Sequence, residues 1–242
     1  MKNKKIIALF ITCLLLFTVV TSVEAGKSKQ RIIYIDTDGQ WSKKTIQQGV
    51  RVARPGDTVF VCSGTYYENV VINKPITLIG EDKDDTIIYG DTTYDIQSAV
   101  INVTSNGVIV AGFTVRGCDF GILLYHSSYC DVLGNDVSIN YLDGIRLDSA
   151  NYNTIFGNMA LNEYVGIRLQ NSSNNMVQNN TASNMIYSGH GILLETYSSS
   201  NTITGNVISN NYYGISFSPY SCVSNLLYSN YFSNNLYDVY DG

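Results

Sequence analysis

The sequence predicts an all-β protein, a right-handed parallel β-helix of about eight coils with a capping helix near its N-terminus. Its first support is an internal repeat. In each copy a glycine stands directly before an Ile-x-Leu or Ile-x-Phe run, and an aspartate takes its place in the last copy: Gly121, Gly144, Gly166, Gly191, Gly214 and Asp238. These residues lie 23, 22, 25, 23 and 24 positions apart, and a period in the twenties is typical of solenoids. Each repeat also holds three short runs of alternating apolar residues separated by Gly, Asn and Ser, which leaves no room for a helix of about ten residues.

The first 25 residues read as a secretory signal peptide. Lys2, Lys4 and Lys5 form a basic start, Ile6–Val20 is largely apolar, and Ala25 is a small residue suited to the cleavage point. About 15 apolar residues are fewer than the roughly 20 that a membrane-spanning helix needs. We therefore expect an exported protein, secreted, at the cell surface or in the periplasm, with no membrane span after the signal is cleaved.

Residues 26–56 are expected to form an N-terminal strand and the capping helix. The segment SKKTIQQGVRVARPGD places Ile46, Val50 and Ala53 on one helical face, with Ser42 as a candidate N-cap and Pro55-Gly56 as a stop. The apolar face of this helix predicts that it covers the open end of the first coil.

Residues 57–242 are expected to form the β-helix, with stacked columns of like residues facing inward. The columns are Ile122, Ile145, Ile167, Ile192 and Ile215, and Leu124, Leu147, Leu169, Leu194 and Phe217. At about 4.8 Å per coil, about eight coils make a rod roughly 40 Å long. The chain stops at Asp241-Gly242 without a visible cap, so we expect a C-terminal extension or a partner to cover the last coil.

Asparagines recur five residues apart within the repeats and are expected to stack as side-chain ladders at the turns. The predicted ladder residues are Asn153 and Asn158, Asn174 and Asn179, Asn201 and Asn206, and Asn225 and Asn230. Two residues after the second Asn comes a further inward candidate: Val137, Ala160, Thr181, Ile208 and Phe232. A row of asparagines that binds glycan is the alternative interpretation.

Composition limits the partners. The chain has a net charge of −5 and only 14% charged residues, with no Lys/Arg stripe after the signal segment, so nucleic acid is not an expected partner.

Four cysteines follow the signal segment: Cys62, Cys118, Cys130 and Cys222. In an exported protein they allow three disulfide pairings, but buried cysteines acting as small apolar residues are the favoured interpretation.

The segment TIQQGVRVARPGDTVFVCSGTYYENVVINKPITLIGE, residues 45–81, resembles the opening of pectin-lyase-fold proteins, including pectin methylesterases. The repeats after about residue 99 resemble those of the NosD family and of carbohydrate-binding and sugar-hydrolase domains. The resemblance covers nearly all of the mature chain and implies a right-handed β-helix. It implies little about activity, because the shared positions are turn and core positions.

The functional residues of these families are mostly missing. Pectin methylesterases carry a Gln-Asp-Thr motif that this chain lacks, and only CDFGILL near Asp119 resembles their second motif. NosD proteins are associated with copper-site assembly in nitrous oxide reductase, which would imply a cluster of Cys, Met or His. His126 and His190 lie about three coils apart, and the Met and Cys residues do not share a column, so we predict no metal site and no cofactor.

Two outward columns contain the candidate binding residues. The first is Leu123, Arg146, Arg168, Leu193 and Ser216, and the second is Tyr125, Asp148, Gln170, Glu195 and Ser218. Charged groups and tyrosines along a groove suit a polysaccharide, so Arg146, Asp148, Arg168, Gln170 and Glu195 are the predicted ligand-binding residues. The alternative is a solvated sheet face with cross-strand ion pairs, in which Asp148 lies diagonal to Arg168 and neutralises it.

The predicted function is a β-helix module that binds a polysaccharide or cell-envelope glycan, or serves a structural role, without catalysis. One alternative is an enzyme that modifies an acidic polysaccharide: a lyase, an epimerase or an inverting hydrolase. Its catalytic candidates are Asp148 and Glu195, two coils apart, near the upper end of the roughly 6.5–9.5 Å separation of inverting glycosidases. A NosD-like accessory protein in copper-site maturation is the second alternative.

Overall fold

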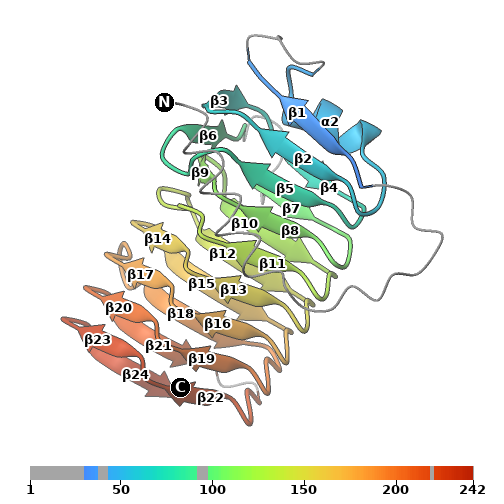
Figure 1. Cartoon of the computed structure of the whole chain (residues 1–242). Coiled ribbons are helices and arrows are strands. Elements are labelled where there is room, and N and C mark those ends of the chain that lie inside the picture. The colour runs from blue at the N-terminus through green and yellow to red at the C-terminus, as the bar shows by residue number, and fades with distance from the viewer. Residues whose placement is uncertain (1–29, 38–42, 92–97, 219–220, 242) are drawn as a thin grey trace.

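The computed structural model describes residues 30–37, 43–91, 98–218 and 221–241. The predicted signal peptide lies outside these residues. The described chain winds into a parallel β-helix, and its coils stack into a rod that runs from the blue N-terminal strands to the red C-terminal strands (Figure 1). In this part of the chain no helix has the length and apolar character needed to cross a membrane.

One face of the rod is a nine-stranded sheet, with one strand per coil. Its strands are, in spatial order, β1 (Ile32–Ile35), β2 (Thr58–Val61), β5 (Thr77–Gly80), β8 (Ile109–Ala111), β11 (Asp131–Leu133), β13 (Thr154–Phe156), β16 (Met176–Gln178), β19 (Thr202–Thr204) and β22 (Leu226–Tyr228). Eight of the nine follow Asp57, in agreement with the eight coils expected from there on. Strand β1 adds a ninth.

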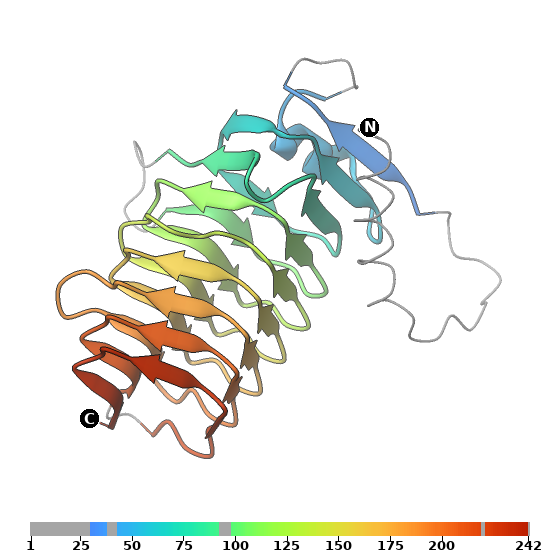
Figure 2. The ribbon, with the colours of Figure 1, turned by 60° about the vertical axis from the view of Figure 1, so that its left-hand side comes forward.

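The second face is an eight-stranded sheet, which holds the predicted binding residues. Its strands are β4 (Val70–Ile72), β7 (Ala99–Val103), β10 (Phe120–Tyr125), β12 (Asp143–Asp148), β15 (Val165–Gln170), β18 (His190–Glu195), β21 (Tyr213–Phe217) and β24 (Tyr237–Asp241). All its pairings are parallel and join equivalent strands of successive coils. Figure 2 shows this stacking from the side.

The third face consists of two smaller sheets in line. The three-stranded sheet contains β3 (Gly64–Tyr67), β6 (Thr86–Tyr89) and β9 (Thr114–Arg116), and the four-stranded sheet contains β14 (Met159–Leu161), β17 (Thr181–Ser183), β20 (Val207–Ser209) and β23 (Tyr231–Ser233). Asp136 forms single bridges to Thr114 and Met159 and so connects the two sheets.

The inward columns predicted from the repeat form the core. Ile122 pairs with Ile145, Ile145 with Ile167, and the column continues in register to Ile215, with every member fully buried. The leucine column stacks in the same way from Leu124 to Leu194. Each coil therefore buries its apolar side chains against the coils on either side, as expected for a solenoid.

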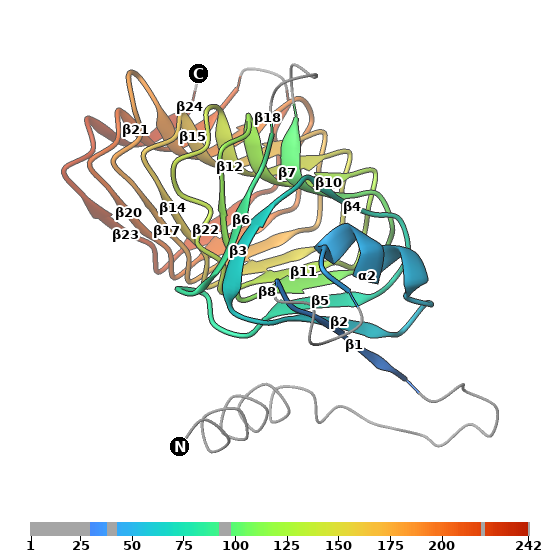
Figure 3. The same cartoon turned by 90° about the horizontal axis from the view of Figure 1, so that it is seen from above.

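Helix α2 (Ile46–Val52) lies across the N-terminal end of the coil stack (Figure 3). Its buried face contains Ile46 and Val50, as predicted. The N-cap is Thr45, whose hydroxyl accepts from the N–H of Gln48 at 3.2 Å, and not the candidate Ser42, which lies outside the described residues. Glu68 accepts from the first backbone N–H groups of the helix at 2.7 and 2.9 Å, and its negative charge also suits the positive end of the helix dipole.

Two asparagine ladders run along the corners on either side of the nine-stranded sheet. The backbone N–H and the side-chain amide of each Asn donate to Oδ1 of the Asn one coil further on, at 2.8–3.1 Å. One ladder contains Asn153, Asn175, Asn201 and Asn225, and the other contains Asn135, Asn158, Asn180, Asn206 and Asn230. These buried amides are hydrogen-bonded, which identifies them as structural groups.

The predicted register is wrong by one residue in a single coil. Asn175 and Asn180 occupy the ladders, whereas the expected Asn174 and Asn179 take left-handed turn positions, with φ of 59° and 55°. The inward residue of the next strand is correspondingly Ala182 and not Thr181. The cause is the two Asn-Asn pairs. In each pair the first Asn replaces the Gly, Tyr or Ser that holds the same turn position in other coils, and the second Asn forms the ladder.

The repeating glycines are required by close stacking of the backbones. A Cβ added to Gly144 would lie 2.8 Å from the carbonyl oxygen of Gly166, and one on Gly166 would lie 2.7 Å from that of Gly191. Neither glycine has a positive φ. These glycines therefore recur in successive coils because the neighbouring backbone leaves no room for a Cβ, and not because a turn requires them.

The cysteines behave as apolar residues. Cys118 and Cys130 lie in the core with unpaired thiols, and Cys62 is half-buried. Burial raises the pKa of all three thiols. Such thiols are poorly reactive.

Candidate functional site

The predicted binding residues lie together on the outer face of the eight-stranded sheet. Arg146 on β12 and Arg168 on β15 are register partners in adjacent coils. The second predicted column also stacks as expected, since Asp148 pairs with Gln170 and Gln170 with Glu195. Strands β12, β15 and β18 therefore bring all five residues to one surface.

Asp143 is the central anion of this surface. Its side chain is fully buried at the start of β12, where both its oxygens accept from Arg168, at 2.9 Å from Nε and 3.0 Å from Nη2. Nη1 of Arg146 lies 3.5 Å from the same carboxylate. One buried carboxylate thus holds two stacked guanidinium groups and offsets their mutual repulsion.

Burial and pairing act in opposite directions on these groups. Burial raises the pKa of Asp143, and the guanidinium of Arg168 opposes that rise. Burial disfavours the charged form of Arg168, but the carboxylates of Asp143 and Glu195 outweigh this effect and raise its pKa. Arg168 is therefore a permanent cation whose charge is already balanced within the protein.

The outer residues of the network complete this balance. Glu195 accepts from Nη1 of Arg168 at 3.1 Å, Asp148 lies 3.7 Å from Nη2 of Arg146, and Gln170 accepts a hydrogen bond from Arg146. The predicted diagonal pair of Asp148 with Arg168 is therefore wrong. Arg168 binds Asp143 and Glu195, and Asp148 lies beside Arg146. With all three carboxylates ionised, two arginines and three carboxylates give the network a formal charge of −1.

An aromatic surface continues from this network toward the C-terminal coils. His190 on β18 stacks on Tyr213 of β21, with ring centroids 4.8 Å apart and an angle of 16°, and Tyr213 stacks on Tyr237 of β24 at 5.5 Å and 19°. Tyr240 lies 4.8 Å from Tyr213, and Tyr212 flanks it from the neighbouring corner at 4.7 Å. Tyr237 and Tyr240 are 44% and 41% exposed, so this surface is available to a ligand. We call these five residues the aromatic surface.

His190 joins the two halves of the site. Its Nδ1 is 2.6 Å from the hydroxyl of Ser216, and its ring is largely buried between the rings of Tyr213 and Tyr164. Burial, followed by the positive charge of Arg168, lowers its pKa to about 4. The imidazole is therefore neutral at physiological pH and acts as part of the aromatic surface.

Sequence reasoning found the arginine and carboxylate columns but missed Asp143 as their common partner, and it missed the aromatic surface. Asp143 and the three stacked rings belong to a third column, one position before the repeating glycine: Phe120, Asp143, Val165, His190, Tyr213 and Tyr237. Aligning the repeats at that position would have shown the three successive rings. Phe120 also supports the network, since the guanidinium of Arg146 lies 4.9 Å above its ring.

This architecture defines a parallel β-helix repeat protein with a polar and aromatic outer face. The chain belongs to the NosD family: the family described as "Periplasmic copper-binding protein (NosD)" matches residues 50–242. No curated protein sequence matches the chain.

Solved structures with the same fold are polysaccharide-active enzymes. An alginate lyase from Paenibacillus sp. superimposes with a TM-score of 0.59 at 15% identity, over 88% of this chain and 98% of its own. The catalytic domain of a GH87 α-1,3-glucanase, crystallised with nigerose, gives a TM-score of 0.68 at 16% identity over 91% of this chain and 42% of its own. The pectate lyase Pel9A gives 0.54 at 16% identity, over 79% and 69%. At such identities the likeness concerns the fold alone.

The described residues do not fit a copper site. Copper in proteins is held by clusters of His, Cys or Met. Nδ1 of His190 bonds with Ser216, Cys118 and Cys130 lie in the core, and His126 lies on the turn after β10, three coil steps from His190. Across the described ranges, no group of three or more His, Cys, Asp or Glu residues is arranged to hold a metal ion.

Proposed function

We propose that this protein is a glycan-binding module, and that its binding surface is the outer face of the eight-stranded sheet from β12 to β24. Sugar rings of a polysaccharide pack against the exposed ring edges of the aromatic surface, and their hydroxyl groups bond with the outer groups of the charged network. The family's description and the predicted signal peptide support a periplasmic location.

The observation that carries the proposal is the in-register stack of His190, Tyr213 and Tyr237 beside Arg168 and Glu195. Aromatic rings give sugars an apolar platform, while a few fixed polar groups orient the hydroxyls. Here the parallel strands position both the rings and the polar groups. Each coil adds one ring, and the rings on either side fix its orientation. The platform is thus formed before any ligand arrives, which lowers the entropic cost of binding.

The charged network supports hydroxyl recognition better than recognition of an acidic sugar. A uronate carboxylate would have to displace Asp143 or Glu195 from Arg168, or add a negative charge to a network that already carries −1. Sugar hydroxyls can instead bond to lone pairs of Asp148, Gln170 and Glu195 that the arginines leave open. The acidic glycan that the two arginines suggested is therefore the weaker form of this proposal.

Binding is tested on a glycan array, followed by calorimetry with the oligosaccharides that bind. Replacing both Tyr213 and Tyr237 with Ala removes the platform, and we expect affinity to fall at least about tenfold. The matched control is Tyr129→Ala/Tyr152→Ala, which removes another exposed stacked pair, with centroids 5.3 Å apart, on the turns before β11 and β13. Equal affinity of the Tyr213/Tyr237 variant and the parent protein contradicts the proposal.

Catalysis is examined in the same samples with an assay for new reducing ends. Asp148 and Glu195 lie beside Arg146 and Arg168, in a network of ion pairs within the protein. We expect no sugar release. Release that disappears in Asp148→Asn or Glu195→Gln would make the protein an enzyme and its binding surface an active site.

A further inference from the structure

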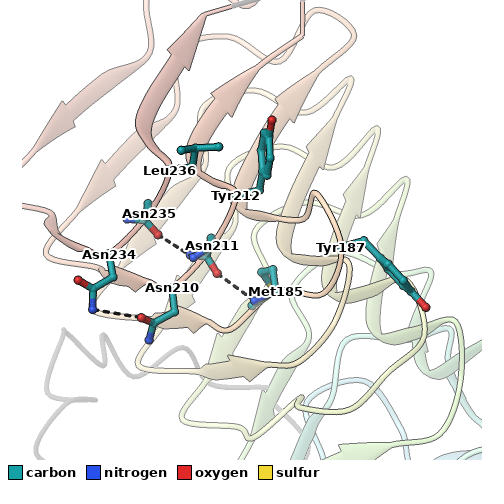
Figure 4. Close-up of a pocket in the computed structure, with 8 residues that line it drawn as sticks. All are labelled: Met185, Tyr187, Asn210, Asn211, Tyr212, Asn234, Asn235 and Leu236. Carbon is teal, nitrogen blue, oxygen red and sulfur yellow. Dashed lines mark hydrogen bonds between the residues drawn. The ribbon is translucent and has the colours of Figure 1, made fainter.

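A shallow depression lies next to the aromatic surface, at the corner between the four-stranded and the eight-stranded sheets (Figure 4). Its walls come from the turns that follow β17, β20 and β23. Tyr212 and Leu236 form one side, Asn210 and Asn234 lie below them, and Tyr187 stands apart on the far side (Figure 4). All eight lining residues are Asn, Tyr, Met or Leu, so none of them carries a charge.

The asparagines in the depression have two distinct roles. Asn211 and Asn235 are structural, because Oδ1 of Asn211 accepts from the N–H of Met185 at 3.1 Å and Oδ1 of Asn235 accepts from the N–H of Asn211 at 3.1 Å. Asn210 and Asn234 are exposed and share a single hydrogen bond of 3.2 Å, from Nδ2 of Asn234 to Oδ1 of Asn210. That bond leaves the amide donors of Asn210 and the carbonyl of Asn234 facing solvent, as a donor and acceptor pair for a ligand.

The rim opposite these amides comes from an insertion. From Ser183 to His190 the chain covers 190 − 183 = 7 steps, whereas the equivalent path from Ser209 to Tyr213 covers 213 − 209 = 4. The three extra residues extend the turn and place Tyr187, which is 88% exposed with φ of 56°, outside the column of shorter turns.

Tyr212 connects the depression to the aromatic surface. Its ring lies 4.7 Å from Tyr213 and 5.8 Å from Tyr237, in tilted or edge contacts. A chain of sugar rings packed against the edges of Tyr213 and Tyr237 can therefore continue around this corner and remain in aromatic contact.

We infer that the depression is a second sugar subsite of the proposed glycan-binding surface, and that it selects an uncharged glycan. This inference rests on the proposed function. Two exposed amides bond with sugar hydroxyls, Tyr212 and Leu236 supply the apolar contact, and no cation is present to pair with a uronate or a sulfate. The bound glycan accordingly runs around the coil from the eight-stranded sheet to the corner, and not only along the rod.

The test is calorimetry of the mature chain with neutral hexasaccharides (nigero- and cello-oligosaccharides) and acidic hexasaccharides (oligoalginate and oligogalacturonate). We expect the parent protein to bind a neutral hexasaccharide with an affinity that does not change between 50 and 500 mM salt, where ion pairing would be screened. In Asn210→Asp/Asn234→Asp, two acceptors replace the amide pair, so affinity should fall about tenfold or more. Tyr187→Ala should weaken binding several-fold.

Asn162→Asp is the matched control, because Asn162 is exposed with φ of 68° at the equivalent turn position two coils before Asn210. Asn210→Ala/Asn234→Ala repeats the test without added charge, and thermal melting verifies the fold of each variant. Unchanged affinity in the Asn210/Asn234 variants, or binding of acidic hexasaccharides only, overturns the subsite. If those variants bind normally while Tyr213→Ala/Tyr237→Ala does not, the proposed function stands without the second subsite. If the parent binds no glycan, both proposals fail.

Discussion

Asp143 shows how a single residue changes the meaning of a sequence pattern. Two arginines in adjacent coils suggest an anion-binding surface, because like charges at that spacing repel each other. The repeat places Asp143 before the glycine of β12, from where its buried carboxylate reaches both guanidinium groups. The arginines were predictable as neighbours from the period alone. Their partner was not, because it depends on side-chain direction at a corner of the coil.

Glu163 is the second residue whose environment determines its chemistry. It follows β14 at the corner position held by Asn140, Met185, Asn211 and Asn235 in other coils, and its side chain is fully buried. Burial, reinforced by the negative charge of Asp136, raises the pKa of Glu163 to about 9 from 4.5. The carboxyl group is therefore protonated at neutral pH.

This raised pKa predicts a stability that depends on pH. The folded protein keeps a proton that the unfolded chain releases above about pH 4.5, so the stabilising contribution is complete below that pH and is lost as the pH rises toward 9. Glu163→Gln is neutral at every pH and should flatten this dependence, with a gain in the free energy of unfolding that is larger at pH 8.5 than at pH 5.5. Urea unfolding at the two pH values measures the difference. Parallel pH dependence in parent and variant would show that Glu163 is not the group that titrates.

At the level of elements, the repeating glycine determines how closely two strands of the eight-stranded sheet approach. In Gly166→Ala, the new Cβ would meet the carbonyl oxygen of Gly191 at 2.7 Å and Cβ of Ala182 at 3.1 Å. Because the first contact is with backbone, we expect a loss of about 1–3 kcal/mol in the free energy of unfolding, measured by chemical denaturation. Gly157→Asn is the control, since Gly157 has open space around it and Asn tolerates its φ of 66°. Equal stability of the two variants would refute the steric role of the repeating glycine.

The strands themselves were largely predictable, because the period of the repeat and the alternation within each run specify which residues stack. Ile122, Ile145 and Ile167 occupy the predicted inward column. The prediction failed where the sequence offers two equal choices: at Asn174-Asn175 and at Asn179-Asn180, either Asn fits the ladder chemistry. A shift of one residue exchanges the two faces of a strand, and so Val177 is buried while Met176 is 42% exposed. Only the stacking of neighbouring coils resolves such pairs.

Across the whole molecule, the two large faces offer different surfaces to a ligand. An outward column of the nine-stranded sheet is apolar through six strands: Tyr34, Phe60, Ile79, Ala111, Leu133 and Phe156. The eight-stranded sheet instead combines rings with hydrogen-bonding groups, and it continues into an uncharged depression at its corner. The sequence predicted one rod with a polar groove. The rings on the C-terminal coils lie one position before the repeating glycine, outside the two columns that predicted the groove.

The position of a bound glycan on this rod distinguishes these surfaces directly. The measurement is a crystal structure of the protein with a neutral hexasaccharide selected on the array. Our account predicts sugar rings over Tyr213 and Tyr237, with hydroxyl groups bonded to the network around Glu195 and one end of the glycan near Asn210 and Asn234. Sugar bound over Phe60 and Phe156 on the nine-stranded sheet, with the aromatic surface empty, would contradict it.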